Sequence, residues 1–74
     1  MRVVIKLLAS LRIGRFKMEE RSMAEGSTVL DVLNLLELQS HQVSIIRVNS
    51  KAVSNDYVLQ DLDQLSLFPP MGGG

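Results

Sequence analysis

The chain has 74 residues, with eight basic and eight acidic side chains and no cysteine. This length suits one small domain with an economical core, because such a domain buries only about 60% of its unfolded surface. Balanced charge disfavours nucleic acid as a partner, and the lack of cysteine excludes disulfides and thiolate sites. No apolar run approaches a membrane span and no signal segment precedes the first strand, so we expect a cytoplasmic protein without a membrane partner.

The beginning of the chain predicts a β-hairpin. Residues 2–9 are rich in β-branched and aliphatic side chains, as strands are. Alternation places three of them on the core face: Val3, Ile5 and Leu7. Lys6 lies on the opposite face, where it needs no buried partner. Residues 10–15 form a connection, and the charged residues 16–23 predict an exposed, antiparallel second strand.

Thr28 and Asp31 predict the start of a helix, because the hydroxyl and the carboxylate can cap each other's backbone N–H groups. Apolar residues follow at helical spacing: Val29, Val32, Leu33 and Leu36. We therefore predict a helix over residues 29–37. A loop over residues 38–42 carries His41, which has no Cys, Asp or Glu beside it and is assigned to the surface.

The second half of the chain returns to strands. Residues 43–48 predict a third strand, and Asn49 and Ser50 a tight turn into a short strand at 51–53. A final strand is expected at 65–68. One helix on one face of a mixed sheet of four to five strands, with the first and last strands adjacent, satisfies this order. The predicted class is α+β, in two layers.

The last six residues read Pro-Pro-Met-Gly-Gly-Gly. The prolines end the strand, since neither donates a backbone hydrogen bond, and they favour a stiff path away from the domain. Residues 71–74 would reach about 13 Å when extended, at ~3.3–3.6 Å per residue, and glycines leave the last carbonyl carbon accessible. We therefore expect a domain over residues 1–70 and a flexible Gly tail over 71–74. The alternative is that residues 71–74 are an ordinary flexible chain end without a chemical function.

Phe68-Pro69-Pro70, followed two residues later by Gly73-Gly74, resembles the end of the small subunit of molybdopterin synthase. The resemblance extends in spacing over the whole chain, but its specific part is the last eight residues. It implies a ubiquitin-like β-grasp fold and a function as a sulfur carrier.

The sequence departs from that family's pattern at two places. Asp61-Leu62-Asp63 stands where the family usually has Asp-Gly-Asp, and residue 72 is a third glycine. The related sulfur carrier of the thiamine pathway also ends in Gly-Gly. It generally lacks the two prolines, so Pro-Pro favours the molybdopterin branch.

The resemblance implies that the reacting group is the terminal carboxylate of Gly74, carried on Gly72 and Gly73. A free carboxylate is a poor electrophile, so a ubiquitin-activating-type adenylyltransferase would activate it with ATP and Mg²⁺. A persulfide protein would then supply sulfur to give a thiocarboxylate, which the large subunit of molybdopterin synthase uses to build the dithiolene of the cofactor. The chain itself would bind no cofactor or metal and would not be catalytic alone, because its partners supply the acids and bases.

Partners also need a surface on which to dock. Alternation assigns Leu65 and Leu67 to the core, so Phe68 points outward, as does Leu8 on the first strand; the two predict an apolar patch at the base of the tail. The resemblance extends the expected partner-binding set to five residues: Leu8, Arg12, Phe68, Pro69 and Pro70. The alternative is that Phe68 folds back over a sheet edge and that Arg12 is an ordinary loop charge.

Three functions remain open from the sequence. The first is a sulfur carrier for the molybdenum or tungsten cofactor. The second keeps this chemistry but changes the acceptor to thiamine thiazole, tRNA, or lysines of target proteins, as in a ubiquitin-like modifier. The third is a noncovalent ubiquitin-like binding module whose Gly tail is inert.

Overall fold

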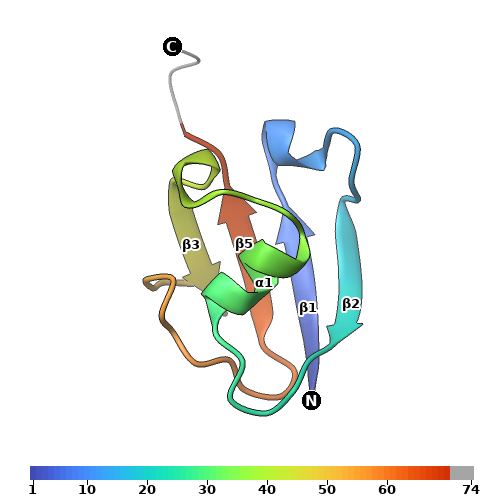
Figure 1. The fold of residues 1–74 in the computed structure, drawn as a ribbon, viewed down its shortest axis with the longest axis vertical. Helices are drawn as coiled ribbons and strands as arrows, with labels where there is room; N and C mark the ends of the chain where they lie inside the picture. Colours follow the sequence, from blue (N-terminus) through green and yellow to red (C-terminus); the bar gives the residue numbers. More distant parts are fainter. Residues whose placement is uncertain (71–74) are drawn as a thin grey trace.

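The computed structural model describes residues 1–70, so the predicted tail, with Gly72, Gly73 and Gly74, lies outside the described residues. The described part contains one five-stranded sheet and one α-helix (Figure 1). The strands are β1 (Arg2–Leu7), β2 (Met18–Ser22), β3 (Ile45–Val48), β4 (Lys51–Ala52) and β5 (Gln64–Phe68). The helix is α1 (Val29–Leu35), and two 3₁₀ turns are η1 (Ala9–Arg12) and η2 (Ser40–Gln42).

The sheet is mixed, with the strand order β2-β1-β5-β3-β4. β1 is antiparallel to β2 and parallel to β5, and β3 is antiparallel to both β5 and β4. The predicted hairpin and the adjacency of the first and last strands are therefore confirmed. Because β5 has neighbours on both sides, the chain leaves the sheet from its middle, at the end opposite the N-terminus (Figure 1).

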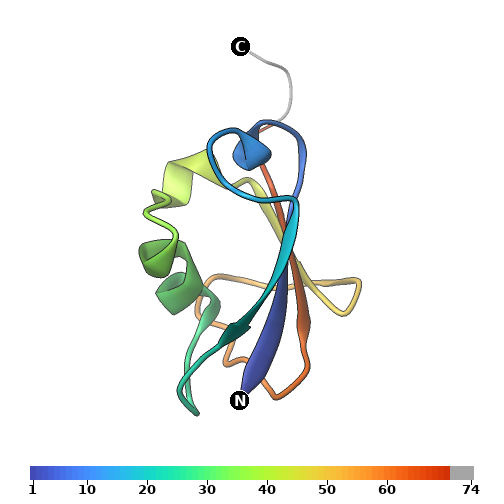
Figure 2. The same ribbon diagram turned by 90° about the vertical axis from the view of Figure 1, so that its right-hand side faces the viewer.

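One face of the sheet is covered by α1, and no element within residues 1–70 covers the other (Figure 2). The covered face carries five completely buried side chains: Val3, Ile5, Leu7, Leu65 and Leu67. The helix contributes Val29, Val32 and Leu33 to the same core. The predicted core face of the first strand and the two-layer α+β architecture are both confirmed, since alternation in the strands and helical spacing in α1 turn aliphatic residues toward one interior.

The N-terminus of α1 has the predicted cap. The Thr28 hydroxyl accepts a hydrogen bond from the Asp31 N–H at 3.3 Å, and the Asp31 carboxylate accepts one from the Thr28 N–H at 2.8 Å. The C-terminus comes earlier than predicted, because Glu37 adopts the left-handed conformation, with φ of +57°. The N–H of buried Leu38 then donates to the Leu33 carbonyl at 2.8 Å, closing the helix with a Schellman motif.

Four strands are shorter than the sequence indicates, and β4 lacks only Val53 of the residues expected at 51–53. β1 ends at Leu7 because Ala9, the last residue of the predicted strand, has φ of +50° and begins η1. β2 lacks the first two and the last of the residues expected at 16–23, and β3 starts two residues late, at Ile45, where pairing with β5 begins. These differences move the ends of the elements and leave their order unchanged.

The turn between β3 and β4 is tied to the start of β5. Asn49 and Ser50 have φ of +51° and +74°, as a type I′ hairpin turn requires, which confirms the predicted turn. The buried Asp63 carboxylate accepts hydrogen bonds from the Asn49 side-chain amide at 2.9 Å and the Gln60 N–H at 2.8 Å. The Asn49 side-chain oxygen in turn accepts from the Gln64 N–H at 3.0 Å, so this network fixes where β5 begins.

Candidate functional site

The end of β5 is held by the backbone on both sides. The Leu8 N–H donates to the Leu67 carbonyl at 3.1 Å, and the Ser44 N–H donates to the Phe68 carbonyl at 2.8 Å. Half-buried Pro69 and exposed Pro70 follow immediately. Because prolines have no N–H to continue the ladder, the backbone is anchored up to Phe68 and then released from the sheet.

Phe68 lies on the uncovered face of the sheet. Its neighbour Leu67 is completely buried, whereas Phe68 is half-buried and pairs across the sheet with Ile45, which is 36% exposed. The guanidinium carbon of Arg47 lies 5.8 Å from the centroid of the Phe68 ring, within the range of a cation–π contact. With half-buried Leu8, these residues form what we call the docking patch: Leu8, Ile45, Arg47 and Phe68.

Arg12 reaches the same end of the sheet from η1. Its Nε atom donates to the Leu7 carbonyl at 2.8 Å, beside the end of β1, while the residue as a whole is exposed. The structure therefore brings together all five residues assigned to partner binding: Leu8, Arg12, Phe68, Pro69 and Pro70. Their role in binding a partner stays a prediction, and Gly72, Gly73 and Gly74 lie outside the described residues.

Two members of the docking patch, Ile45 and Arg47, were missed in the sequence. The signal was present, because Val48 is a core residue and strand alternation then turns Ile45 and Arg47 to the opposite face. Their closeness to Phe68 could not be obtained in this way. It depends on the register that pairs Ile45 with Phe68.

Elsewhere, the described residues offer little chemistry. Among residues 1–70, no three His, Cys, Asp or Glu side chains lie close enough together to hold a metal ion, and His41 is exposed in η2. No helix in the described part is sufficiently long and apolar to span a membrane.

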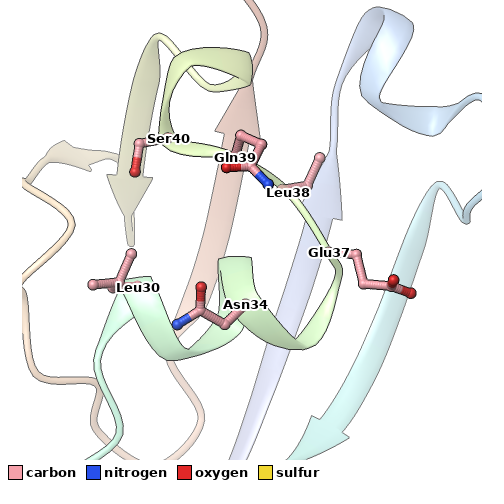
Figure 3. A pocket seen from close by; sticks show the side chains of 6 residues that line it. All are labelled: Leu30, Asn34, Glu37, Leu38, Gln39 and Ser40. Atoms are coloured by element: carbon pink, nitrogen blue, oxygen red, sulfur yellow. The ribbon is translucent and has the colours of Figure 1, made fainter.

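A hollow of about 390 Å³ lies on the helix layer, between α1 and the segment that follows it (Figure 3). It is lined by Leu30, Asn34, Glu37, Leu38, Gln39 and Ser40. None of the residues assigned to the site from the sequence lines it. The described residues assigned to the site from the sequence therefore lie around the end of β5 and not at this hollow.

Comparisons with known proteins agree with this geometry. The model of the ThiS family matches residues 5–74. No curated protein matches the sequence. A candidate molybdopterin converting factor subunit 1 from Pyrococcus furiosus has a similar structure, with 28% identity, a TM-score of 0.75, and coverage of 96% of this chain and 99% of that one.

Two further solved structures share the fold over 100% of both chains. SAMP1 from Haloferax volcanii is 24% identical, with a TM-score of 0.78. The molybdopterin-converting factor from Helicobacter pylori, solved as a complex of its subunits 1 and 2, is 19% identical in the matching chain, with a TM-score of 0.68. The fold is thus the ubiquitin-like β-grasp that the resemblance implies, and the chain belongs to the ThiS family of ubiquitin-like sulfur carriers.

Proposed function

We propose that this chain carries sulfur as a thiocarboxylate on Gly74 and donates it in the synthesis of molybdopterin. The observation that carries the proposal is the anchoring of Phe68 in the middle of the sheet, immediately before Pro69 and Pro70. This arrangement provides a rigid base for the Met-Gly-Gly-Gly segment. The match to the family model, which extends to residue 74, supports the same end of the chain.

The proposed chemistry proceeds in three steps. The Gly74 carboxylate attacks the α-phosphate of ATP, and pyrophosphate leaves to give an acyl-adenylate. A persulfide on a donor protein then attacks the carbonyl carbon, and AMP leaves. A thiol finally cleaves the sulfur–sulfur bond, which releases the thiocarboxylate and leaves a disulfide between the thiol and the donor. The acids and bases for these steps belong to the partner proteins, as in other covalent group transfers between proteins.

We propose further that the docking patch and Arg12 contact these partners. In the Helicobacter pylori complex, a protein of the same fold is solved together with subunit 2 of its molybdopterin-converting factor. Half-buried Leu8 and Phe68 and exposed Ile45 provide apolar contact area at the base of the tail, and Arg47 lies over the aromatic ring. Aromatic and Arg side chains are the types that contribute most to the binding energy of interfaces.

The test is intact-mass analysis of the protein after incubation with ATP, Mg²⁺, an adenylating enzyme and a persulfide donor. We expect the mass change of one oxygen replaced by sulfur at the terminus. Deleting Gly73 and Gly74 together, which removes the terminal Gly-Gly, should abolish the change and leave thermal stability unaltered. No mass change with a demonstrably active enzyme would leave a noncovalent binding module as the function.

A second deletion tests the length of the tail separately from the identity of the reacting group. Removing one glycine, which gives the same chain whichever of Gly72, Gly73 and Gly74 is deleted, keeps a terminal Gly-Gly but shortens the tail by about 3.4 Å. We expect this variant to be loaded with sulfur and to transfer it more slowly to the large subunit. Equal sulfur loading of the chain that lacks both Gly73 and Gly74 would contradict the assignment of the reacting group to the terminal Gly-Gly.

The acceptor is tested with the loaded protein. We expect a molybdopterin synthase large subunit to consume the thiocarboxylate in the presence of the pterin precursor. Preferential consumption by a thiazole synthase, by a tRNA-thiolating enzyme or by protein lysines would keep the carrier chemistry and replace the acceptor.

A further inference from the structure

The charges of this chain cancel in number but not in position. Residues 6–18 carry four basic side chains and no acidic one: Lys6, Arg12, Arg15 and Lys17. Residues 54–63 carry three acidic side chains and no basic one: Asp56, Asp61 and Asp63. A summed charge of zero therefore conceals two segments of opposite sign.

The fold places these segments at opposite ends of the domain. The Lys17 carbonyl accepts a hydrogen bond from the Leu7 N–H at 3.0 Å, so the basic segment lies beside the end of β1, where β5 also ends (Figure 1). The Asp61 carboxylate instead accepts from the Arg2 N–H at 2.8 Å, at the end where the chain begins. The base of the tail is consequently the electropositive end. We call Lys6, Arg12, Arg15 and Lys17 the basic collar.

The nearest acidic side chains along the sequence do not neutralise the collar. Glu19 forms an ion pair with Arg21 at 3.3 Å, and Glu20 forms one with Arg2. Within residues 1–70, no member of the collar forms an ion pair. All four are exposed, so their charge is directed to the solvent around the end of the sheet.

The loop within the collar also presents an apolar side chain. Ile13 is 76% exposed, and the loop is held by hydrogen bonds from the Ile13 N–H to the Ser10 carbonyl at 3.2 Å and from the Arg15 N–H to the Arg12 carbonyl at 2.9 Å. An apolar side chain between arginines is typical of a protein interface, where buried apolar contact is surrounded by polar groups. The aromatic residue between Arg15 and Lys17, Phe16, is half-buried, packs against the core and has the guanidinium carbon of Arg21 5.8 Å from its ring centroid. It is therefore not presented for stacking on bases, which favours protein over nucleic acid.

We infer that the basic collar and Ile13 receive an acidic surface of the adenylating partner and steer it to the end of the domain that bears the tail. This inference rests on the proposed sulfur-carrier function, which requires such a partner. Opposite charges raise the rate of association, and the acidic far end disfavours the reverse approach. The collar therefore orients the domain so that residues 71–74 arrive first.

The experiment measures association and dissociation rates of the purified adenylating enzyme with the full chain, without ATP, over a range of NaCl concentrations. For the unmodified chain, we expect the association rate to fall as salt rises. The double variant R15E/K17E should associate roughly tenfold more slowly at low salt. Its association rate should respond less to salt, and its dissociation rate should change much less.

The matched pair K17E and K51E distinguishes the collar from total charge. Both lysines are exposed and both substitutions change the charge equally, but Lys51 lies in β4, outside the collar. We expect K17E to slow association and K51E to leave it nearly unchanged. Equal slowing by both, or an R15E/K17E variant with unaltered rate and salt dependence, would overturn the inference.

Different measurements test the role of the basic collar and the sulfur-carrier proposal, so the failure of one can be distinguished from the failure of the other. Rates measured without ATP report on the collar, whereas the intact mass after prolonged incubation reports on the chemistry of Gly74. If the unmodified chain does not associate with the enzyme, the inference that the basic collar steers this partner is overturned. Tighter binding of the chain to poly(U) RNA than to the enzyme, lost in R15E/K17E, would also overturn it in favour of nucleic acid.

Discussion

The two faces of the sheet use the same strands for different purposes. On the face covered by α1, Leu65 and Leu67 of β5 are completely buried among other aliphatic side chains. On the uncovered face, Ser66 and Phe68 of the same strand are only half-buried, and Arg47 lies against the ring. Consecutive residues therefore meet opposite environments, because side chains alternate between the faces of a strand.

This difference between the two faces indicates that residues important for stability and residues important for partner binding can be substituted separately. Substitutions on the covered face should act through the free energy of unfolding, and substitutions on the uncovered face should act through partner affinity. The segments beyond the sheet, at the C-terminus of α1 and before β5, should affect stability by smaller amounts, because they involve few buried atoms.

The largest effect is expected for Leu67→Ala. Removing a completely buried side chain leaves a cavity and should lower the free energy of unfolding by about 2–5 kcal/mol. Urea denaturation followed by circular dichroism measures this change. The exposed and chemically identical substitution Leu62→Ala is the control, since Leu62 is 66% exposed. A loss below about 1 kcal/mol for Leu67→Ala would contradict the comparison of the faces.

The neighbouring substitution Phe68→Ala should separate the two faces most clearly. We expect affinity for a cognate large subunit to fall by about 2 kcal/mol, the size of an interface hot spot. The unfolding free energy should fall much less than in Leu67→Ala, because the ring is only half-buried. Isothermal titration calorimetry and urea denaturation measure the two quantities, with Ser66→Ala as the control on the same face. Equal destabilisation by the two neighbouring substitutions would break the distinction.

Asp63→Ala should cost about 1–3 kcal/mol of stability, because the Asn49 amide and the Gln60 N–H lose their common acceptor in a buried position. Asp63→Asn retains one acceptor oxygen and should lose less. Thermal unfolding measures both variants. If the two substitutions were equally harmless, the hydrogen-bond network before β5 would not support the sheet.

The smallest effect is a gain in stability for Glu37→Gly. Residue 37 has φ of +57°, which glycine adopts without the steric cost that other residues bear. We expect a gain of about 0.5–1 kcal/mol in urea denaturation. Glu37→Ala is the control and should bring no gain, because alanine keeps the Cβ atom. A comparable gain in both variants would point to the lost charge instead.

Local patterns in the sequence predicted a large part of this structure. Alternation identified the buried face of β1, and the spacing of Thr28 and Asp31 located the cap of α1. The end of α1 was placed two residues too late, because nothing in the sequence marks Glu37 for the left-handed conformation that glycine usually occupies. Ile45 and Arg47 were missed for a different reason, since a docking patch depends on register across strands.

By itself, the sequence determined what acts over a few residues: the alternating strands, the helix cap, and the two prolines that follow β5. Only the tertiary structure decided that β5 lies in the middle of the sheet and that the backbone N–H groups of Leu8 and Ser44 donate to the carbonyls of its last residues. It also decided that four basic side chains lie around the end of β5, although the net charge of the whole chain is zero. These features join residues separated by long stretches of chain, so they follow from strand pairing and not from any local preference.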